Sequence, residues 1–114
     1  MIKQVLVLRH DLKCRRGKEI AQGAHAAIGA LKQAPNNWVK EWEKDGCTKI
    51  CVHVQDEKAL LDLTQKVSKS KLPCYLVVDA GRTEFNGVHT FTALGIGPGP
   101  SELIDVFTGI LPLL

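Results

Sequence analysis

The sequence has no uninterrupted run of about 18 apolar residues, which is the length that a membrane-spanning helix needs. It also lacks the features of a signal peptide at its start. The first residues, MIKQVLVLRHD, begin directly with a strand-like run and hold neither a long apolar core nor a small-residue cleavage site. From these two absences we expect a protein that acts in the cytoplasm and has no membrane partner.

No two of the four cysteines have the CxxC spacing. Cys47, Cys51 and His53 could be read as metal ligands, but no second ligand pair follows at a spacing typical of zinc sites. Reduced thiols in a core and at its margins explain the cysteines more simply. We therefore expect no metal and no cofactor.

The composition is that of an ordinary globular domain. With 114 residues, 45% apolar and 24% charged, the chain fits one domain with a modest core over residues 1–114. The net charge of +3 says little, but basic residues cluster near the start, opposed only by Asp11: Arg9, Lys13, Arg15, Arg16 and Lys18. Such a cluster suits phosphate groups, although charge alone favours a solvated loop equally.

Apolar patterns predict four strands and four helices in the order β-α-α-β-α-β-β-α. The expected strands span residues 5–8, 49–54, 75–78 and 90–96, and the expected helices span 18–33, 38–44, 57–69 and about 101–108. The sequence thus predicts an α/β fold, a single domain with a mixed four-stranded sheet and helices on both faces. The last two strands should be antiparallel if they are neighbours, because their connection is short.

Local signals place several of the boundaries. Asp56 should cap the third helix, and Ser101 or Gly99 should cap the last one, which should stop at Gly109. The segment Gly97-Pro98-Gly99-Pro100 should break the fourth strand, since proline removes a backbone donor.

The first predicted helix, residues 18–33, has three different faces at 100° per residue. An apolar face, which should pack on the sheet, holds Ile20, Ala24, Ala27, Ile28 and Leu31. A polar face, which should line an opening beside the sheet, holds Lys18, Gln22, His25, Gly29 and Lys32. A strip of small residues, Gly23, Ala26 and Ala30, would let another backbone or a flat ligand approach closely. Periodicity alone favours an ordinary solvated face for Lys18 and Gln22, and a buried histidine with one hydrogen bond for His25.

The segment DAGRT, residues 79–83, follows the end of a buried strand. In open α/β sheets, ligands bind at the carboxyl ends of the strands. Lys18 follows the loop after the first strand, so Lys18 and Asp79 should lie at the same edge if the first and third strands are parallel. The turn alone is weak evidence, because Asp and Gly are common turn residues.

Three segments occur in one order: LRHDLKCRRGKEIAQGAHAA, DAGRT and TALGIGPGPSELIDVFTGILPLL. Together they resemble the archaeal and eukaryotic class of peptidyl-tRNA hydrolases, over about residues 2 to 113. Members of that family cleave the ester that joins a peptide to the terminal ribose of tRNA, and so release peptides stranded when translation aborts. The resemblance implies peptidyl-tRNA as the substrate, a mixed four-stranded sheet, and a homodimer, which is frequent in the family.

The resemblance also marks individual positions. The family's catalytic and substrate-positioning residues correspond to Lys18, Gln22, His25, Asp79, Thr83 and Thr92. The candidates for phosphate contacts are Arg9, Lys13, Arg15, Arg16 and Arg82. Three places depart from the family pattern. His10 stands where a small polar residue is usual, Cys14 where methionine is common, and the segment 85–91 lacks a typical proline and is one residue longer.

Ester hydrolysis needs an activated water and stabilisation of a developing oxyanion. No serine or cysteine lies in a G-x-S-x-G motif, so direct attack by water is simpler than an acyl-enzyme. Asp79 is the candidate base or water orienter, and His25 is an alternative base. Lys18 could stabilise the oxyanion or hold the 3′ phosphate, while Thr83 and Thr92 can position water or ribose.

Two functions of other classes remain open. The chain could be a catalytically silent RNA-binding domain whose altered 85–91 segment blocks the chemistry. It could also be a protein-interaction module that uses the small-residue strip of the first helix. The intact set of Lys18, Asp79 and Thr83 favours the enzyme.

Overall fold

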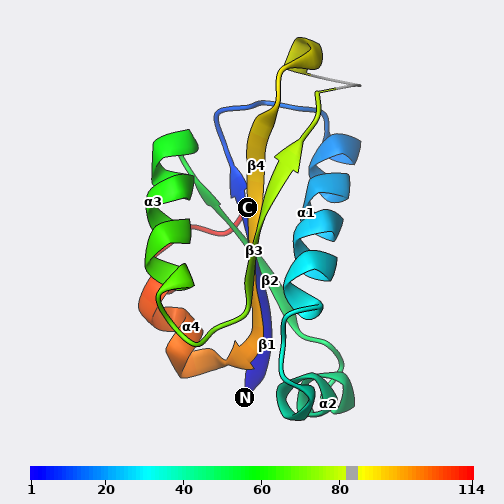
Figure 1. The fold of residues 1–114 in the computed structure, drawn as a ribbon, viewed down its shortest axis with the longest axis vertical. Coiled ribbons are helices and arrows are strands. Elements are labelled where there is room, and N and C mark those ends of the chain that lie inside the picture. The colour runs from blue at the N-terminus through cyan, green and yellow to red at the C-terminus, as the bar shows by residue number, and fades with distance from the viewer. Residues whose placement is uncertain (82–84) are drawn as a thin grey trace.

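The computed structural model describes residues 1–81 and 85–114 (Figure 1). Its strands are β1 (Ile2–Arg9), β2 (Lys49–Val54), β3 (Cys74–Asp79) and β4 (Thr90–Pro100). Its helices are α1 (Arg16–Leu31), α2 (Asn36–Lys44), α3 (Glu57–Ser68) and α4 (Ser101–Thr108), with a 3₁₀ helix η1 (Phe85–Gly87). The strands and helices expected from the sequence are all present, and β1 and β4 are longer than predicted.

The strands form one mixed sheet in the order β2-β1-β4-β3. β1 is parallel to β2 and antiparallel to β4, and β4 is antiparallel to β3. β1, β2 and β3 therefore point the same way, and their carboxyl ends meet at the top of Figure 1. α1 covers one face of the sheet, and α3 and α4 cover the other. The predicted fold class and the antiparallel pairing of the last two strands are confirmed.

A packed core lies on each face of the sheet, because side chains alternate between faces along a strand. On the side of α3 and α4, Val5 and Val7 of β1 pack with Leu60, Leu94 and Ile104. On the side of α1, the core is built from Leu6, Leu8, Ala26, Val77 and Ala93.

Some of the helix caps predicted from the sequence are present in the structure and others are not. The Asp56 carboxylate accepts a hydrogen bond from the Ala59 N–H at 2.9 Å, so the predicted cap of α3 is confirmed. The predicted cap of α4 is wrong, because Pro100 precedes the helix and no side chain caps it. Ser101 donates instead to the carbonyl oxygen of Met1. The stop at Gly109 is as predicted.

The prediction that GPGP ends the fourth strand is wrong, since β4 continues to Pro100. β3 pairs with β4 only as far as Ile96, and just beyond it the Gly97 N–H donates to the Pro73 carbonyl oxygen. From Pro98 on, the strand that pairs with β4 in the described part of the chain is β1. Proline is tolerated on such an edge, where one side of the backbone needs no donor. The pairing with β1 also shifts register between Lys3 and Val5, which accommodates the Gly97-Pro98 step.

The expected packing of α1 is wrong in its orientation. The large residues of its apolar face point outward, with Ile20 66% and Ile28 55% exposed. The small-residue strip packs on the sheet instead, because β4 approaches so closely that a β-carbon at Gly95 would overlap the carbonyl oxygen of Ala26. The strip therefore does admit another backbone, as its composition predicted, and it is not available as a docking surface.

Candidate active site

An amine and a carboxylate meet at the carboxyl edge of the sheet. Asp79 is the last residue of β3, and Lys18 lies in the first turn of α1, which starts just beyond β1. Because β1 and β3 run parallel, both side chains reach the same place. The Lys18 Nζ lies 2.9 Å from Asp79 Oδ2, and the side chains are only 16% and 11% exposed. The proximity expected from the sequence is confirmed.

A buried chain of hydrogen bonds holds the pair in place. The Gln22 Nε2 donates to Asp79 Oδ2 at 2.8 Å, and the Thr92 hydroxyl donates to Gln22 Oε1 at 2.5 Å. Gln22 and Thr92 are each 2% exposed. The orientation of the carboxylate is thus coupled through Gln22 to β4 in the middle of the sheet.

The turn after β3 fixes the second carboxylate oxygen. The Gly81 N–H donates to Asp79 Oδ1 at 2.6 Å. Gly81 has φ of +77°, and a β-carbon there would overlap the backbone of Val88, so glycine is required at this position. The ion pair with Lys18 is the main cause that lowers the pKa of Asp79 below 3.8, and the bonds from Gly81 and Gln22 add to it.

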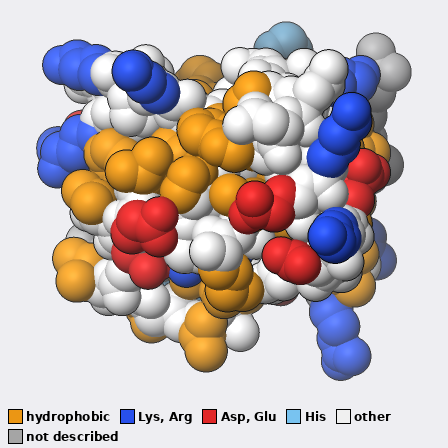
Figure 2. All heavy atoms as spheres, turned by 90° about the horizontal axis from the view of Figure 1, so that it is seen from below, with side chains coloured by type: hydrophobic (Ala, Val, Ile, Leu, Met, Phe, Trp, Pro, Cys, Tyr) orange, Lys and Arg blue, Asp and Glu red, His pale blue; other side chains and the backbone are white. Residues whose placement is uncertain are grey.

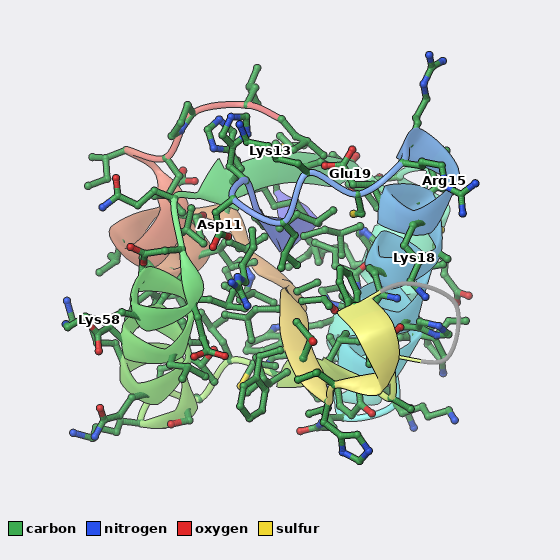
Figure 3. The ribbon with its side chains drawn as sticks, turned by 90° about the horizontal axis from the view of Figure 1, so that it is seen from above. Asp11, Lys13, Arg15, Lys18, Glu19 and Lys58 are labelled. Carbon is green, nitrogen blue, oxygen red and sulfur yellow. The ribbon has the colours of Figure 1, made fainter. Side chains whose placement is uncertain are left out.

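An aromatic ring completes the surroundings of Lys18. Its Nζ lies 5.9 Å from the centroid of the Phe85 ring, a distance compatible with a cation–π contact. Viewed from above, Lys18 lies on the side of α1 that faces η1 (Figure 3). The sequence did not identify Phe85 as a site residue, because only the fold brings η1 next to α1.

A groove of about 520 Å³ leads away from Asp79 between α1 and β3. Its α1 wall carries Gln22, His25, Gly29 and Lys32, so these members of the polar face line an opening as predicted. Lys18, the remaining member, binds Asp79 instead of lining the groove. His25 is exposed rather than buried. Its β3 wall includes Tyr75, whose ring lies so close to Gly29 that a β-carbon there would overlap it. Sequence reasoning missed Tyr75, which no motif marks.

The basic residues near the start of the chain differ in their surroundings. Lys13, Arg15 and Arg16 are exposed where the loop after β1 leads into α1, and Figure 3 shows Lys13 and Arg15 along that loop. Arg9 is internal by comparison: its side chain is 10% exposed and donates to both carboxylate oxygens of Asp11 and to the Phe91 carbonyl. Arg82 and Thr83 lie outside the described residues.

Within residues 1–81 and 85–114, no cluster of three or more His, Cys, Asp or Glu side chains could hold a metal ion. The rings of His10 and His53 do lie close, with centroids 4.7 Å apart. No helix in this part of the chain is long and apolar enough to cross a membrane.

A mostly buried amine–carboxylate pair at the mouth of a groove, at the carboxyl edge of an α/β sheet, is typical of a catalytic site. The profile of the family "Peptidyl-tRNA hydrolase PTH2" matches residues 2–114. The chain therefore belongs to the PTH2 family of peptidyl-tRNA hydrolases. This membership confirms the expected class of enzyme, a carboxylic ester hydrolase that acts on peptidyl-tRNA.

Individual relatives agree over the full chain. A peptidyl-tRNA hydrolase of Methanopyrus kandleri is 47% identical over 116 residues, which cover 100% of this chain and 99% of that protein. One of Methanothermobacter thermautotrophicus is 42% identical and covers 99% of this chain and 100% of the relative. "Peptidyl-tRNA hydrolase 2, mitochondrial" of Bos taurus is 44% identical over 97% of this chain, which matches 63% of that protein.

Proposed function

We propose that the protein cleaves peptidyl-tRNA by direct attack of water at the Lys18–Asp79 pair. The water oxygen attacks the ester carbonyl carbon and the bond to the ribose oxygen breaks. The products are the peptide carboxylate and the free ribose hydroxyl of the tRNA. The Lys18 ammonium stabilises the negative charge that develops on the carbonyl oxygen, as a preorganised donor does. The observation that carries this proposal is the 2.9 Å contact of Lys18 with Asp79 at the head of the groove.

In this scheme Asp79 orients the attacking water and does not act as the general base that accepts its proton. A carboxylate whose pKa lies below 3.8 is a weak base at neutral pH, whereas an efficient base titrates near the working pH. Asp79 therefore orients the attacking water and the Lys18 ammonium. The proton of the water passes to His25 and from there to the departing ribose oxygen, which leaves as the free hydroxyl. The His25 side chain lines the same groove and is of a type suited to proton transfer near neutral pH.

Three further side chains position groups in this scheme. Gln22 and Thr92 hold the carboxylate through their buried hydrogen bonds. Thr83, which the family motif marks, positions water or ribose through its hydroxyl.

Release of peptide from an N-acetylated peptidyl-tRNA, measured together with tRNA binding, tests the proposal. Binding without release would favour the silent RNA-binding domain instead.

The tRNA backbone is proposed to bind along the basic loop at the top of the molecule. Lys13, Arg15 and Arg16 are exposed there, next to the start of α1 and Lys18. Arg82 is proposed from sequence alone, and Arg9 has the least free surface because it binds Asp11. Figure 2 shows the opposite end, where apolar and acidic side chains lie near the middle and Lys and Arg side chains lie around the margin. The acidic and apolar middle of that end is a poor match for phosphates.

Replacing Arg15 and Arg16 with alanine should weaken tRNA binding and flatten its salt dependence. Each lost phosphate contact removes up to about one unit from the slope of log K against log salt. The effect should appear mainly in KM, because phosphates far from the ester change little at the transition state. Binding titrations at several salt concentrations measure the slope, and an unchanged slope would show that the RNA docks elsewhere.

We also propose that two copies of the chain associate through the outward apolar face of α1. A second groove of about 590 Å³ lies there, lined by Leu6, Leu8, Ile20, Ala24, Ile28 and Leu114 among others. Charged side chains of both signs also line its rim, Lys49 against Glu19. In a dimer with a two-fold axis, the basic side chain of one copy can lie opposite the acidic side chain of the other.

Ile20→Glu should convert this dimer to a folded monomer, because it puts a charge into the proposed apolar contact. Val106→Glu is the matched control, since Val106 is 77% exposed on α4, which covers the other face of the sheet. Sedimentation equilibrium of the three proteins gives their masses. A monomeric wild type, or a dimeric Ile20→Glu, would remove this interface.

The proposed location is the cytoplasm, where translation produces the substrate. The name of the bovine relative instead places that protein in mitochondria. Fractionation of the source cells, with an antibody against the chain, distinguishes the two compartments.

A further inference from the structure

A free strand edge borders the groove that leads away from Asp79. β3 is the outermost strand of the sheet in the described part of the chain. Alternate residues of an edge strand direct their N–H and C=O groups outward, where an extended peptide can pair with them. Tyr75 and Val78 are 42% and 51% exposed, so this strand is accessible from solvent.

The lining of the groove suits a peptide better than RNA. Ile28, Tyr75, Val77 and Val78 contribute apolar surface, and away from Asp79 the ionisable side chains are His25 and Lys32. The exposed basic residues Lys13, Arg15 and Arg16 instead lie where the chain enters α1. When the ester of a peptidyl-tRNA lies at Asp79, the peptide can therefore lie in the groove while the tRNA lies along the basic loop.

The dimensions of the groove set the length of chain it can hold. Along the α1 wall, the distance from Gln22 to Lys32 is about 15 Å at a rise of about 1.5 Å per residue. Along β3 and its end, the distance from Tyr75 to Ala80 is about 16 Å at about 3.3 Å per residue. Both walls match about four to five residues of extended peptide.

We propose that this groove binds the peptide limb of the substrate as an extended strand beside β3. The inference rests on the proposed ester hydrolysis at Asp79, and it names the subsite for the acyl part. The carboxyl-terminal residue of the peptide lies at the head of the groove, so the peptide runs parallel to β3. Main-chain hydrogen bonds supply affinity without selecting side chains, which suits peptides of any sequence.

A series of peptidyl-tRNAs that differ only in peptide length tests the subsite. The probes are N-acetylated oligoalanines of one to six residues on the same tRNA. In the wild type, kcat/KM should rise by about tenfold or more up to four or five residues and then level off, as a few added hydrogen bonds predict. N-methylation of alternate amides in the five-residue probe should abolish the rise of kcat/KM with length. It removes N–H donors from the peptide and leaves the protein unchanged.

The variant Tyr75→Ala removes the ring that forms part of the β3 wall. We expect it to lower the ratio of kcat/KM between the five-residue and one-residue probes by about fivefold or more. Tyr75→Phe should keep the ratio, and Val106→Ala, on the other side of the sheet, should leave every rate unchanged.

The outcomes separate this inference from the proposed hydrolysis. A flat dependence on length, or an N-methylated probe that matches its parent, overturns the peptide subsite while ester cleavage stands. An equal loss for all probes in Tyr75→Ala also overturns it and assigns the groove to the 3′ end of the RNA. If the wild type hydrolyses no probe, the proposed chemistry fails and the inference fails with it.

Discussion

Asp79→Asn should lose most hydrolysis, by on the order of a hundredfold or more, and still bind tRNA. Asparagine keeps the shape of the side chain, and its oxygen can still accept the hydrogen bond that Gly81 donates to Oδ1. Its amide nitrogen, however, would face two donors, the Lys18 ammonium and the Gln22 amide. The negative charge that holds the ammonium and orients water is gone.

The stability of Asp79→Asn should fall only slightly, by about 1–2 kcal/mol for the mismatched donors. Thermal unfolding measures that loss, and peptide release under single turnover measures the chemistry. If Asp79 served only to cap the turn, the variant would keep its activity. A loss of activity that merely tracks a collapse of stability would support the structural role instead.

Lys18→Ala should also lower turnover by on the order of a hundredfold or more, as expected for loss of a donor to the oxyanion. The lysine is mostly buried and ion-paired, so a modest loss of stability accompanies the change. Near-normal turnover in a folded variant would reduce Lys18 to a structural partner of Asp79. Lys66→Ala, which removes an exposed lysine of α3 on the other face of the sheet, is a matched control for the loss of positive charge.

The pKa of Asp79 supplies a second readout for Lys18→Ala. Lys18 is the main cause of the lowered pKa, so the pKa of Asp79 should rise toward 3.8 in the variant. A carboxyl whose pKa is lowered on folding stabilises the fold above its unfolded pKa, and that contribution is lost as pH falls through the folded pKa. Asp79 should therefore contribute less to acid unfolding in the variant. Carboxyl NMR titration measures the shift, and an identical pKa in both proteins would contradict the ion pair.

The main parts of the site could be predicted from sequence because they depend on local patterns. The polar face of α1 follows from helical periodicity, and DAGRT follows directly on a buried strand. Parallel β1 and β3 then bring Lys18 and Asp79 to one edge. Gln22 was expected to position substrate, whereas its buried bonds reach Asp79 and Thr92, a connection that no periodicity could show.

The parts that failed depend on close approach between distant segments. Helical periodicity predicted that the large apolar residues of α1 face the sheet. The close contact between Gly95 of β4 and Ala26 of α1 leaves room only for small residues between helix and sheet. The glycines and prolines of residues 97–100 predicted a break in β4. The strand continues because β3 no longer pairs with it at Pro98, so the missing N–H of proline leaves no hydrogen bond unmade on that side. Phe85 and Tyr75 carry no local signal at all, and they join the site only through tertiary packing.

The central claim is that Lys18 and Asp79 act as one unit in the attack of water. Single-turnover release of peptide by the wild type, Lys18→Ala, Asp79→Asn and the double variant tests it most directly, with tRNA binding checked for each protein. Residues that act together are strongly non-additive. We predict that the double variant is about as slow as either single one. Losses that multiply, or a single variant that keeps the wild-type rate, would contradict the account.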